Sequence, residues 1–161
     1  MARTQKITTF LWFNGNAEEA VEFYTSIFAD SRITNVARWG EGGPGRQGDV
    51  MNIAFELAGQ AFIALNGGPQ YSFTPAISLF VSCESQAEVD ELWTRLLAGG
   101  GKPNGCGWLD DRFGLSWQIV PSALIELMSD ADAKASGRVA QALMGMERID
   151  IATLQRAHLA A

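Results

Sequence analysis

The stretch CGWLDDRFGLSWQIVP, from Cys106 to Pro121, places polar side chains at spacings that favour ligand binding. Asp110, Asp111 and Gly114 are turn formers, so we expect a hairpin followed by a strand. Side chains alternate along a strand, which puts Gln118 on the face opposite a set of apolar residues. A buried amide needs a hydrogen-bond partner, and a ligand or a neighbouring strand could supply one. Gln118 is therefore a candidate binding residue.

The thiols and the histidine are too few and too scattered to indicate a familiar catalytic or zinc site. Cys83 and Cys106 lack CxxC spacing and make no disulfide framework. Cys106 lies between glycines and is a candidate exposed thiol, but no histidine stands near it in the sequence to activate it. Cys83 ends an apolar run, which favours a small buried residue. For His158, the only histidine, a surface or packing role is favoured over metal binding.

Carboxylate pairs invite a general acid–base interpretation, but local patterns explain most of them better. Glu18-Glu19 suits the start of a helix, and Asp110-Asp111 suits a turn. Glu56 is the one carboxylate that would face a cleft by strand alternation, although a solvated edge position is favoured.

The tryptophans divide into two groups by their surroundings. Trp93 and Trp117 recur with apolar neighbours at helix and strand spacing, which predicts core positions. Trp12 and Trp108 each lie close to a glycine turn and are candidates for the mouth of a cleft. Aromatic walls of this kind bind flat or apolar small molecules, and core packing explains the two residues equally well.

The composition is that of a folded globular protein without a nucleic-acid partner. The 161 residues are 47% hydrophobic and 19% charged, enough to build a core. The net charge of -6 argues against nucleic acid, because phosphate neutralisation needs clustered Lys and Arg. We find no signal-peptide pattern and no run near the roughly 18 apolar residues of a membrane span. The expected location is the cytoplasm, with no membrane partner.

The first half predicts a strand, a helix and three strands. Apolar β-formers from Ile7 to Phe13 end at a turn, and Asn16 is expected to cap a helix with Val21 and Tyr24 on its apolar side. Further strands are expected at 32–39, 50–57 and 60–65, with a glycine-rich loop at 40–48.

The second half repeats this order, which indicates a duplication. From Pro75 we expect a strand at 76–83, a helix at 85–98 capped by Ser85, and an extended segment at 102–108 before the hairpin. After Pro121 the sequence favours helices, with Asp130 and Asp150 as expected caps. The predicted tail helices span 122–128, 131–144 and 151–159.

These motifs together resemble a known family. The NGNAEEAVEFYTSIF helix, the LNGGP turn, the QAEVDELW helix and the CGWLDDRFGLSWQIVP hairpin are similar to the PhnB-like branch of the vicinal oxygen chelate superfamily. That superfamily includes glyoxalase, bleomycin-resistance and extradiol dioxygenase proteins. The branch is often labelled 3-demethylubiquinone-9 3-methyltransferase.

The resemblance implies an α+β fold of paired βαβββ modules, whose curled mixed sheets form a cleft, followed by a C-terminal helical tail. The expected division is a domain at 1–121, with modules at about 7–67 and 75–121, and a tail at 122–161. Family members imply a homodimer that completes its clefts with both chains, and the apolar side of the tail supports this expectation.

Catalytic members of the superfamily hold a divalent metal with His, Gln and Glu ligands on four strands. The resemblance places those positions at Thr9, near Ala64, near Ser78 and at Gln118, a poor set of ligands for a hard ion. We therefore expect no metal and no cofactor. The expected cleft floor comprises Thr9, Leu11, Ala64, Asn66, Ser78, Phe80, Ser116 and Gln118.

The favoured function is metal-free binding of a small molecule, with a candidate site formed by Thr9, Trp12, Asn66, Ser78, Trp108 and Gln118. An enzyme is the alternative, either a methyltransferase as the family label states or a glyoxalase-like lyase or isomerase. The glycine-rich segments at 40–45 and 99–101 do not fit the common S-adenosylmethionine site, because neither follows a strand and opens a helix. A structural interaction module is the third interpretation.

Overall fold

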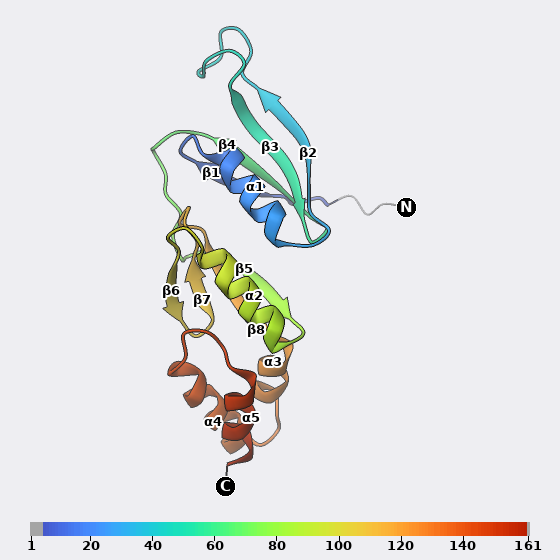
Figure 1. The fold of residues 1–161 in the computed structure, drawn as a ribbon, viewed down its shortest axis with the longest axis vertical. Helices are drawn as coiled ribbons and strands as arrows, with labels where there is room; N and C mark the ends of the chain where they lie inside the picture. The colour runs from blue at the N-terminus through green and yellow to red at the C-terminus, as the bar shows by residue number, and fades with distance from the viewer. Residues whose placement is uncertain (1–4, 161) are drawn as a thin grey trace. The chain divides into compact units, whose positions relative to one another are not determined.

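The structure is a computed structural model that describes residues 5–160 of the chain. The chain forms two compact units, one ending at Phe73 and one beginning at Thr74 (Figure 1). Each unit contains a four-stranded mixed sheet, and the strand orders are β1-β4-β3-β2 and β5-β8-β7-β6. The two orders are equivalent element by element, so the predicted duplication is confirmed at the level of topology.

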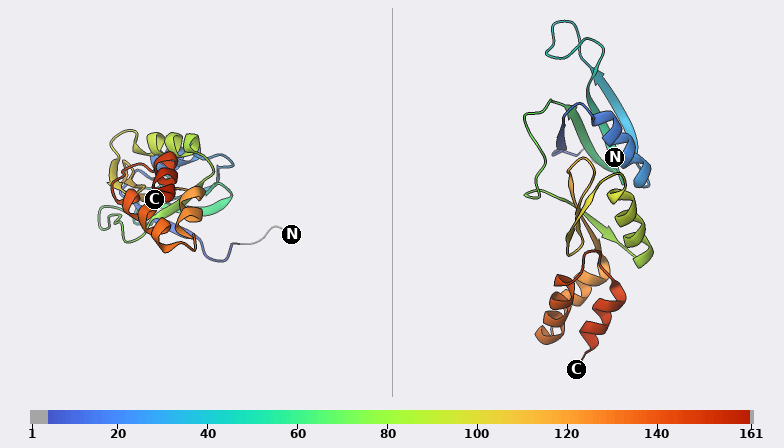
Figure 2. Two further views of the ribbon diagram at one scale, coloured as in Figure 1. Left: turned by 90° about the horizontal axis from the view of Figure 1, so that it is seen from below. Right: turned by 60° about the vertical axis from the view of Figure 1, so that its left-hand side comes forward.

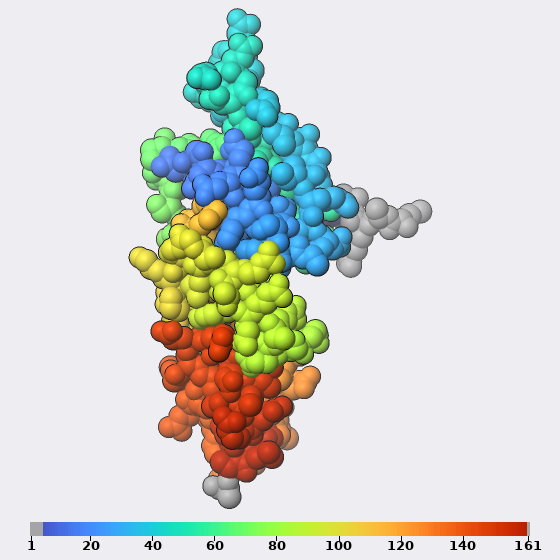
Figure 3. Space-filling model, in the orientation of Figure 1, coloured from blue at the N-terminus to red at the C-terminus, as the bar shows by residue number. Residues whose placement is uncertain are grey.

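The first unit follows the predicted strand–helix–strand–strand–strand order. A parallel pair joins β1 to β4, and antiparallel pairs join β4 to β3 and β3 to β2. The loop at 40–48, which joins β2 to β3, projects from the end of these strands (Figure 3). The elements are β1 (Thr9–Phe13), α1 (Ala17–Ile27), β2 (Arg32–Arg38), β3 (Val50–Leu57) and β4 (Gln60–Asn66).

Helix α1 covers one face of the first sheet because its apolar residues recur at helical spacing. Ala20, Val21 and Tyr24 are fully buried, and they meet a sheet face that includes Phe55 and Ile53. The predicted cap is wrong here: Asn16 makes no side-chain hydrogen bond to the helix start.

The second unit repeats the arrangement with α2 across its sheet (Figure 1). Here the predicted cap is confirmed, because the Ser85 hydroxyl accepts a hydrogen bond from the Glu88 N–H. Trp93 and Trp117 are buried between α2 and the sheet, as predicted. The elements are β5 (Leu79–Cys83), α2 (Gln86–Leu97), β6 (Lys102–Gly105), β7 (Trp108–Asp110) and β8 (Ser116–Pro121).

One predicted segment is wrong in this unit. The extended run expected from Lys102 to Trp108 is broken by a tight turn at Cys106 and Gly107, so β6 and β7 form a hairpin of their own. The backbone there has φ of 54° at Cys106 and 83° at Gly107. Glycine adopts this left-handed region freely, which is why Gly107 ends the extended run.

The tail forms three helices that pack on one another and on the end of β8 (Figure 2). Val120, Val139, Ile149 and Leu154 are buried together in its core. The helices are α3 (Ser122–Met128), α4 (Ala133–Met144) and α5 (Ile151–Leu159).

The caps of the tail helices agree only in part with the prediction. Asp150 caps α5 by accepting a hydrogen bond from the Thr153 N–H, as predicted. The prediction that Asp130 caps the middle helix is wrong, because Asp132 accepts hydrogen bonds from Lys134 and Ala135 instead. No helix among residues 5–160 is both long and apolar enough to cross a bilayer.

Candidate ligand site

In the second sheet, one face is covered by α2 and the opposite face is open. Phe80, Gln118 and Trp108 are paired across β5, β8 and β7, so they form one row on the open face. Phe80 is 52% exposed, whereas Trp117 and Ile119, on either side of Gln118 in β8, are buried on the other face. Neighbouring strands are about 4.8 Å apart, so the row spans roughly 10 Å.

Gln118 occupies the centre of this row. Its Nε2 donates a hydrogen bond to the Ser78 hydroxyl at 2.9 Å, just before β5 begins. Within residues 5–160, the Gln118 side-chain oxygen has no hydrogen-bond partner. The sequence left open whether a ligand or a neighbouring strand would partner the amide. The nitrogen bonds to the segment beside β5, and the oxygen is an acceptor without a hydrogen-bond partner among residues 5–160.

Asp110 and Ser116 form a second polar pair on the same face. The Ser116 hydroxyl donates to Asp110 Oδ1 at 2.5 Å, and the two residues are paired across β7 and β8. Ser116 is buried, so its hydroxyl serves the carboxylate rather than solvent. The second oxygen of Asp110 remains a hydrogen-bond acceptor beside the row.

A cavity of about 480 Å³ lies over the outer strands of this sheet. Trp108 and Asp110 line it from β7, and Cys106 lines it from the turn. Such a volume is within the usual range of small-molecule sites. Its remaining walls are Pro75, Asn104 and Gly105.

Asp111 holds the hairpin that carries this site. Its buried carboxylate accepts hydrogen bonds from the backbone N–H groups of Phe113 and Leu115 and from the Trp117 indole. These bonds tie the turn to β8 and fix which side chains of β8 face outward. The prediction that Asp110-Asp111 belongs to a turn is therefore confirmed for Asp111.

In the first unit, the strand faces are the reverse of the expectation. Leu11 and Ala64 are buried on the face that α1 covers, and Thr9 lies on that face in line with Phe62. The open face instead carries Phe10 and the residues that are paired with it on the adjacent strands. A shift of one residue in aligning a strand moves every side chain to the other face, which is the cause of the error.

Asn66 also lies toward α1 and has a structural role there. Its Oδ1 accepts from the Ala17 N–H at 2.9 Å, and its Nδ2 donates to Glu18 and to the Val50 carbonyl. Asn66 therefore caps α1 from a neighbouring strand, which Asn16 does not. A side chain on another strand cannot be recognised as a helix cap from local sequence.

Trp12 lies beside the LNGGP turn and packs against it. Its indole N–H donates to the Gly68 carbonyl, and its ring meets the edge of Tyr71 with centroids 5.0 Å apart. A Cβ at Gly67 would lie 2.3 Å from the Trp12 ring, so this glycine allows the close approach. Whether Trp12 contacts a ligand stays a prediction.

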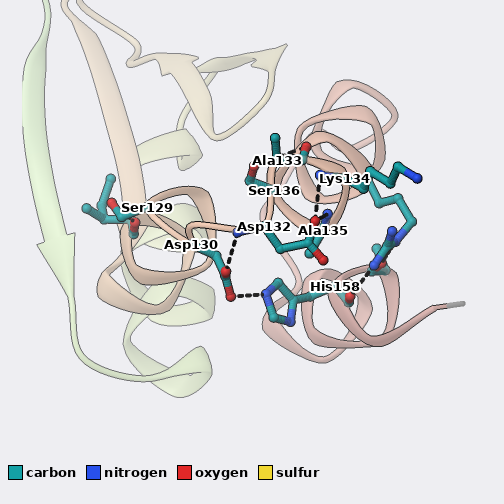
Figure 4. Close-up of polar contacts among 11 residues, drawn as sticks. Ser129, Asp130, Asp132, Ala133, Lys134, Ala135, Ser136 and His158 are labelled. Atoms are coloured by element: carbon teal, nitrogen blue, oxygen red, sulfur yellow. Dashed lines mark hydrogen bonds and ion pairs between the residues drawn. The ribbon is translucent and has the colours of Figure 1, made fainter.

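The remaining candidates have structural surroundings. Cys83 is fully buried as predicted, and burial raises its pKa to about 11. Glu56 forms an ion pair with Arg32 at 2.7 Å on the surface of the first sheet. His158 packs in the tail, with Nε2 2.8 Å from Asp130 Oδ2 (Figure 4).

The donors at the implied metal positions do not fit a divalent ion. Ala64 has no donor, Thr9 faces the helix-covered side, and Gln118 bonds to Ser78. Across residues 5–160, no three His, Cys, Asp or Glu side chains gather closely enough to hold a metal. The residue set thus departs from that of the metal-dependent members of the fold.

The duplicated βαβββ topology is that of the glyoxalase, or vicinal oxygen chelate, fold. The sequence model of the 3-demethylubiquinone-9 3-methyltransferase family matches residues 5–120, and the chain belongs to this family. A PhnB protein from Bacillus cereus is 42% identical, with a TM-score of 0.67 over 73% of this chain and 100% of that chain.

Two more distant structures support the fold alone. Protein PA1353 from Pseudomonas aeruginosa is 22% identical, with a TM-score of 0.61 over 73% of this chain and 98% of its own. The fosfomycin resistance protein FosX from Listeria monocytogenes is 16% identical, with a TM-score of 0.53 over 77% of this chain and 98% of its own. No curated protein matches the chain.

Proposed function

We propose that the chain binds a flat, two-ring-sized small molecule that carries a hydroxyl or N–H donor, without a metal ion. The observation that carries this proposal is the row formed by Phe80, Gln118 and Trp108 on the open face of the second sheet. Two aromatic side chains supply apolar contact area, and the free oxygen of Gln118 accepts the ligand's donor.

The charges near the row agree with a ligand that donates hydrogen bonds. The Asp110 carboxylate lies on the same face. Within residues 5–160 it accepts one hydrogen bond from a protein hydroxyl. A neutral hydroxyl or amine can therefore bond to either acceptor, whereas an anion would meet the Asp110 charge. Anionic ligands are expected to bind more weakly for this reason.

Calorimetric titration with 2-naphthol tests the proposal directly. The wild type is expected to bind it, and Trp108→Ala is expected to weaken binding about tenfold, because an aromatic contact and its buried area are lost. Trp39→Ala, which alters a tryptophan of the first unit, is the matched control and should bind as the wild type does. Absence of binding to the wild type, or equal weakening by both variants, would refute the proposal.

Methyl transfer is the second candidate because the family description names it. The glycine-rich loop at 40–48 joins two strands, and Gly99 to Gly101 follow a helix, so neither segment opens a helix beside a nucleotide. Calorimetry with S-adenosylmethionine discriminates the two functions. Binding stronger than that of 2-naphthol, with methyl transfer to a phenolic acceptor, would favour the enzyme.

We further infer that the protein acts in the cytoplasm as a homodimer. Both cysteines are free thiols, which suits a reducing compartment. Phe10 is more than half exposed on the open face of the first sheet, which a second copy would cover. Sedimentation equilibrium at micromolar concentration should give twice the chain mass, and a monomer at all concentrations would contradict the inference.

A further inference from the structure

The helical tail contacts the candidate site through main-chain hydrogen bonds. The N–H of Cys106 donates to the Met146 carbonyl at 2.7 Å, and the N–H of Gly107 donates to the Glu147 carbonyl at 2.8 Å. The Cys106 thiol is 3.5 Å from the Leu143 carbonyl. The turn between β6 and β7 is thus held by the segment that joins α4 to α5.

Close packing supports these hydrogen bonds. Ile149 is fully buried and lies against Gly107, where a Cβ would come within 2.7 Å of its Cδ1 atom. Gly107 in turn accepts a hydrogen bond from Ile119 of β8. The tail therefore packs directly against the residue that immediately precedes Trp108.

The same segment is anchored to α2 from its other side. Gln86 Nε2 donates to the Ile149 carbonyl at 3.0 Å, and its Oε1 accepts from the Ile151 N–H at 2.8 Å. Arg148 adds an ion pair with Asp90 at 3.2 Å. The atoms of the tail abut those of α2 in Figure 3. Residues 143–151 are thus fixed between the helix and the turn.

The tail also limits the open face of the second sheet. Val120 alternates with Gln118 along β8, so it lies on the same face, yet it is buried in the apolar core of the tail. The open row of Phe80, Gln118 and Trp108 crosses β8 at Gln118, two residues before Val120. One end of the candidate site is therefore defined by the tail.

The family match ends at residue 120, and the tail begins at Ser122. The tail is thus an element of this chain outside the part on which membership of the family rests. An element that touches one wall of a cavity is well placed to alter the cavity's width.

We propose that residues 143–151 act as a clamp that positions the Cys106–Gly107 turn and Trp108, and so determines which ligands the cavity accepts. The proposal rests on the proposed function for its ligand and on the observed hydrogen bonds for its mechanism. The clamp residues are positioning residues, since none of them lines the cavity itself. Loosening the clamp leaves the sheet intact and frees one wall of the site.

Gln86→Leu in the full-length protein tests the clamp, because it removes both side-chain bonds to the tail at nearly constant volume. Gln155→Leu makes the same chemical change on an exposed position of α5 and serves as the control. Amide hydrogen exchange, read by NMR, should accelerate about tenfold at Cys106 and Gly107 in Gln86→Leu, as expected for losing one or two hydrogen bonds. The control should exchange as the wild type does.

Ligand selectivity separates positioning from a general loss of stability. The dissociation constant for phenol divided by that for 2-naphthol measures how well the site selects the larger ligand. This ratio should fall at least threefold in Gln86→Leu, because the freed wall no longer selects for size. If Gln86→Leu does not fold, Gln86→Glu is the second variant, and the same changes are expected. It keeps the acceptor for Ile151, removes the donor to Ile149 and Asp90, and places a second carboxylate beside Asp90.

The outcomes are distinguishable from those for the proposed function. Unchanged exchange at Cys106 and Gly107 would overturn the clamp, and so would faster exchange with an unchanged selectivity ratio. If the wild type binds neither compound, the proposed function and the clamp's role in selectivity both fail. The exchange data then still decide whether the tail holds the turn.

Discussion

The Gln118 amide nitrogen and the Ser78 hydroxyl are joined by a 2.9 Å hydrogen bond between β8 and the start of β5. The bond orients the amide and leaves its oxygen available on the open face. With the amide nitrogen turned to Ser78, the atom on the open face is an acceptor. The orientation of Gln118 is therefore what gives the row its expected preference for hydrogen-bond donors.

Replacing Gln118 by Ala should weaken 2-naphthol binding about fivefold, because one hydrogen bond to the ligand hydroxyl is lost. Naphthalene has no hydroxyl, so its affinity should be nearly the same for the variant and the wild type. Fluorescence titration of both compounds measures the difference. Equal weakening for the two ligands would show that Gln118 acts through packing and not as an acceptor.

Replacing Asp111 by Ala should lower the free energy of unfolding by about 2–4 kcal/mol, because two backbone N–H groups and the Trp117 indole lose their buried acceptor. Asp49→Ala removes an exposed carboxylate and should change stability by less than about 0.5 kcal/mol. Urea unfolding provides both values. Similar effects of the two changes would contradict a structural role for Asp111.

Asn66→Ala should destabilise the first unit by about 1–2 kcal/mol, since the start of α1 loses its acceptor and Glu18 loses its donor. Asn35→Ala on the exposed strand β2 is the matched control. Exchange of the Ala17 amide, read by NMR, should accelerate only in Asn66→Ala. If Ala17 stays protected, a different group caps the helix.

The tail contains a carboxylate whose ionisation is coupled to stability. The N–H of Asp132 and the side chain of His158 hold the pKa of Asp130 below its ordinary value (Figure 4). A lowered folded-state pKa means that the stabilisation is complete above the unfolded value of about 3.9 and is lost as the pH falls through the folded value.

The difference in melting temperature between the wild type and Asp130→Asn should therefore be positive at pH 7 and shrink below about pH 4. Asp49→Asn, on the surface of the first unit, is the control and should show a smaller change with pH. Differential scanning calorimetry across this range measures both. A constant difference for Asp130→Asn would mean that the carboxylate charge contributes nothing.

The two cysteines should react at very different rates with a thiol-specific disulfide reagent at pH 8. Burial raises the Cys83 pKa to about 11, so little thiolate forms and the reagent cannot reach it. Cys106 is partly exposed and lines the cavity. One thiol should react in the native wild type and none rapidly in Cys106→Ser. A rapidly reacting Cys83 would show that the second unit opens locally.

Local patterns in the sequence determined most of the secondary structure and the order of the two modules. The spacing of apolar residues in α1 and α2 and the capping residues Ser85 and Asp150 act within a few positions of the chain, so they can be recognised directly. The alternation in β8 likewise places Gln118 and Trp117 on opposite faces, because successive side chains of a strand point to opposite sides of the sheet.

Only the tertiary structure decided which groups meet across long stretches of chain. Asn66 caps a helix 49 residues away, and Cys106 bonds to the tail through backbone atoms that carry no residue identity. The faces of β1 and β4 depend on register, where one position reverses the assignment of Thr9 and Ala64. Main-chain bonds and register are set by packing of whole elements, and a linear pattern does not record them.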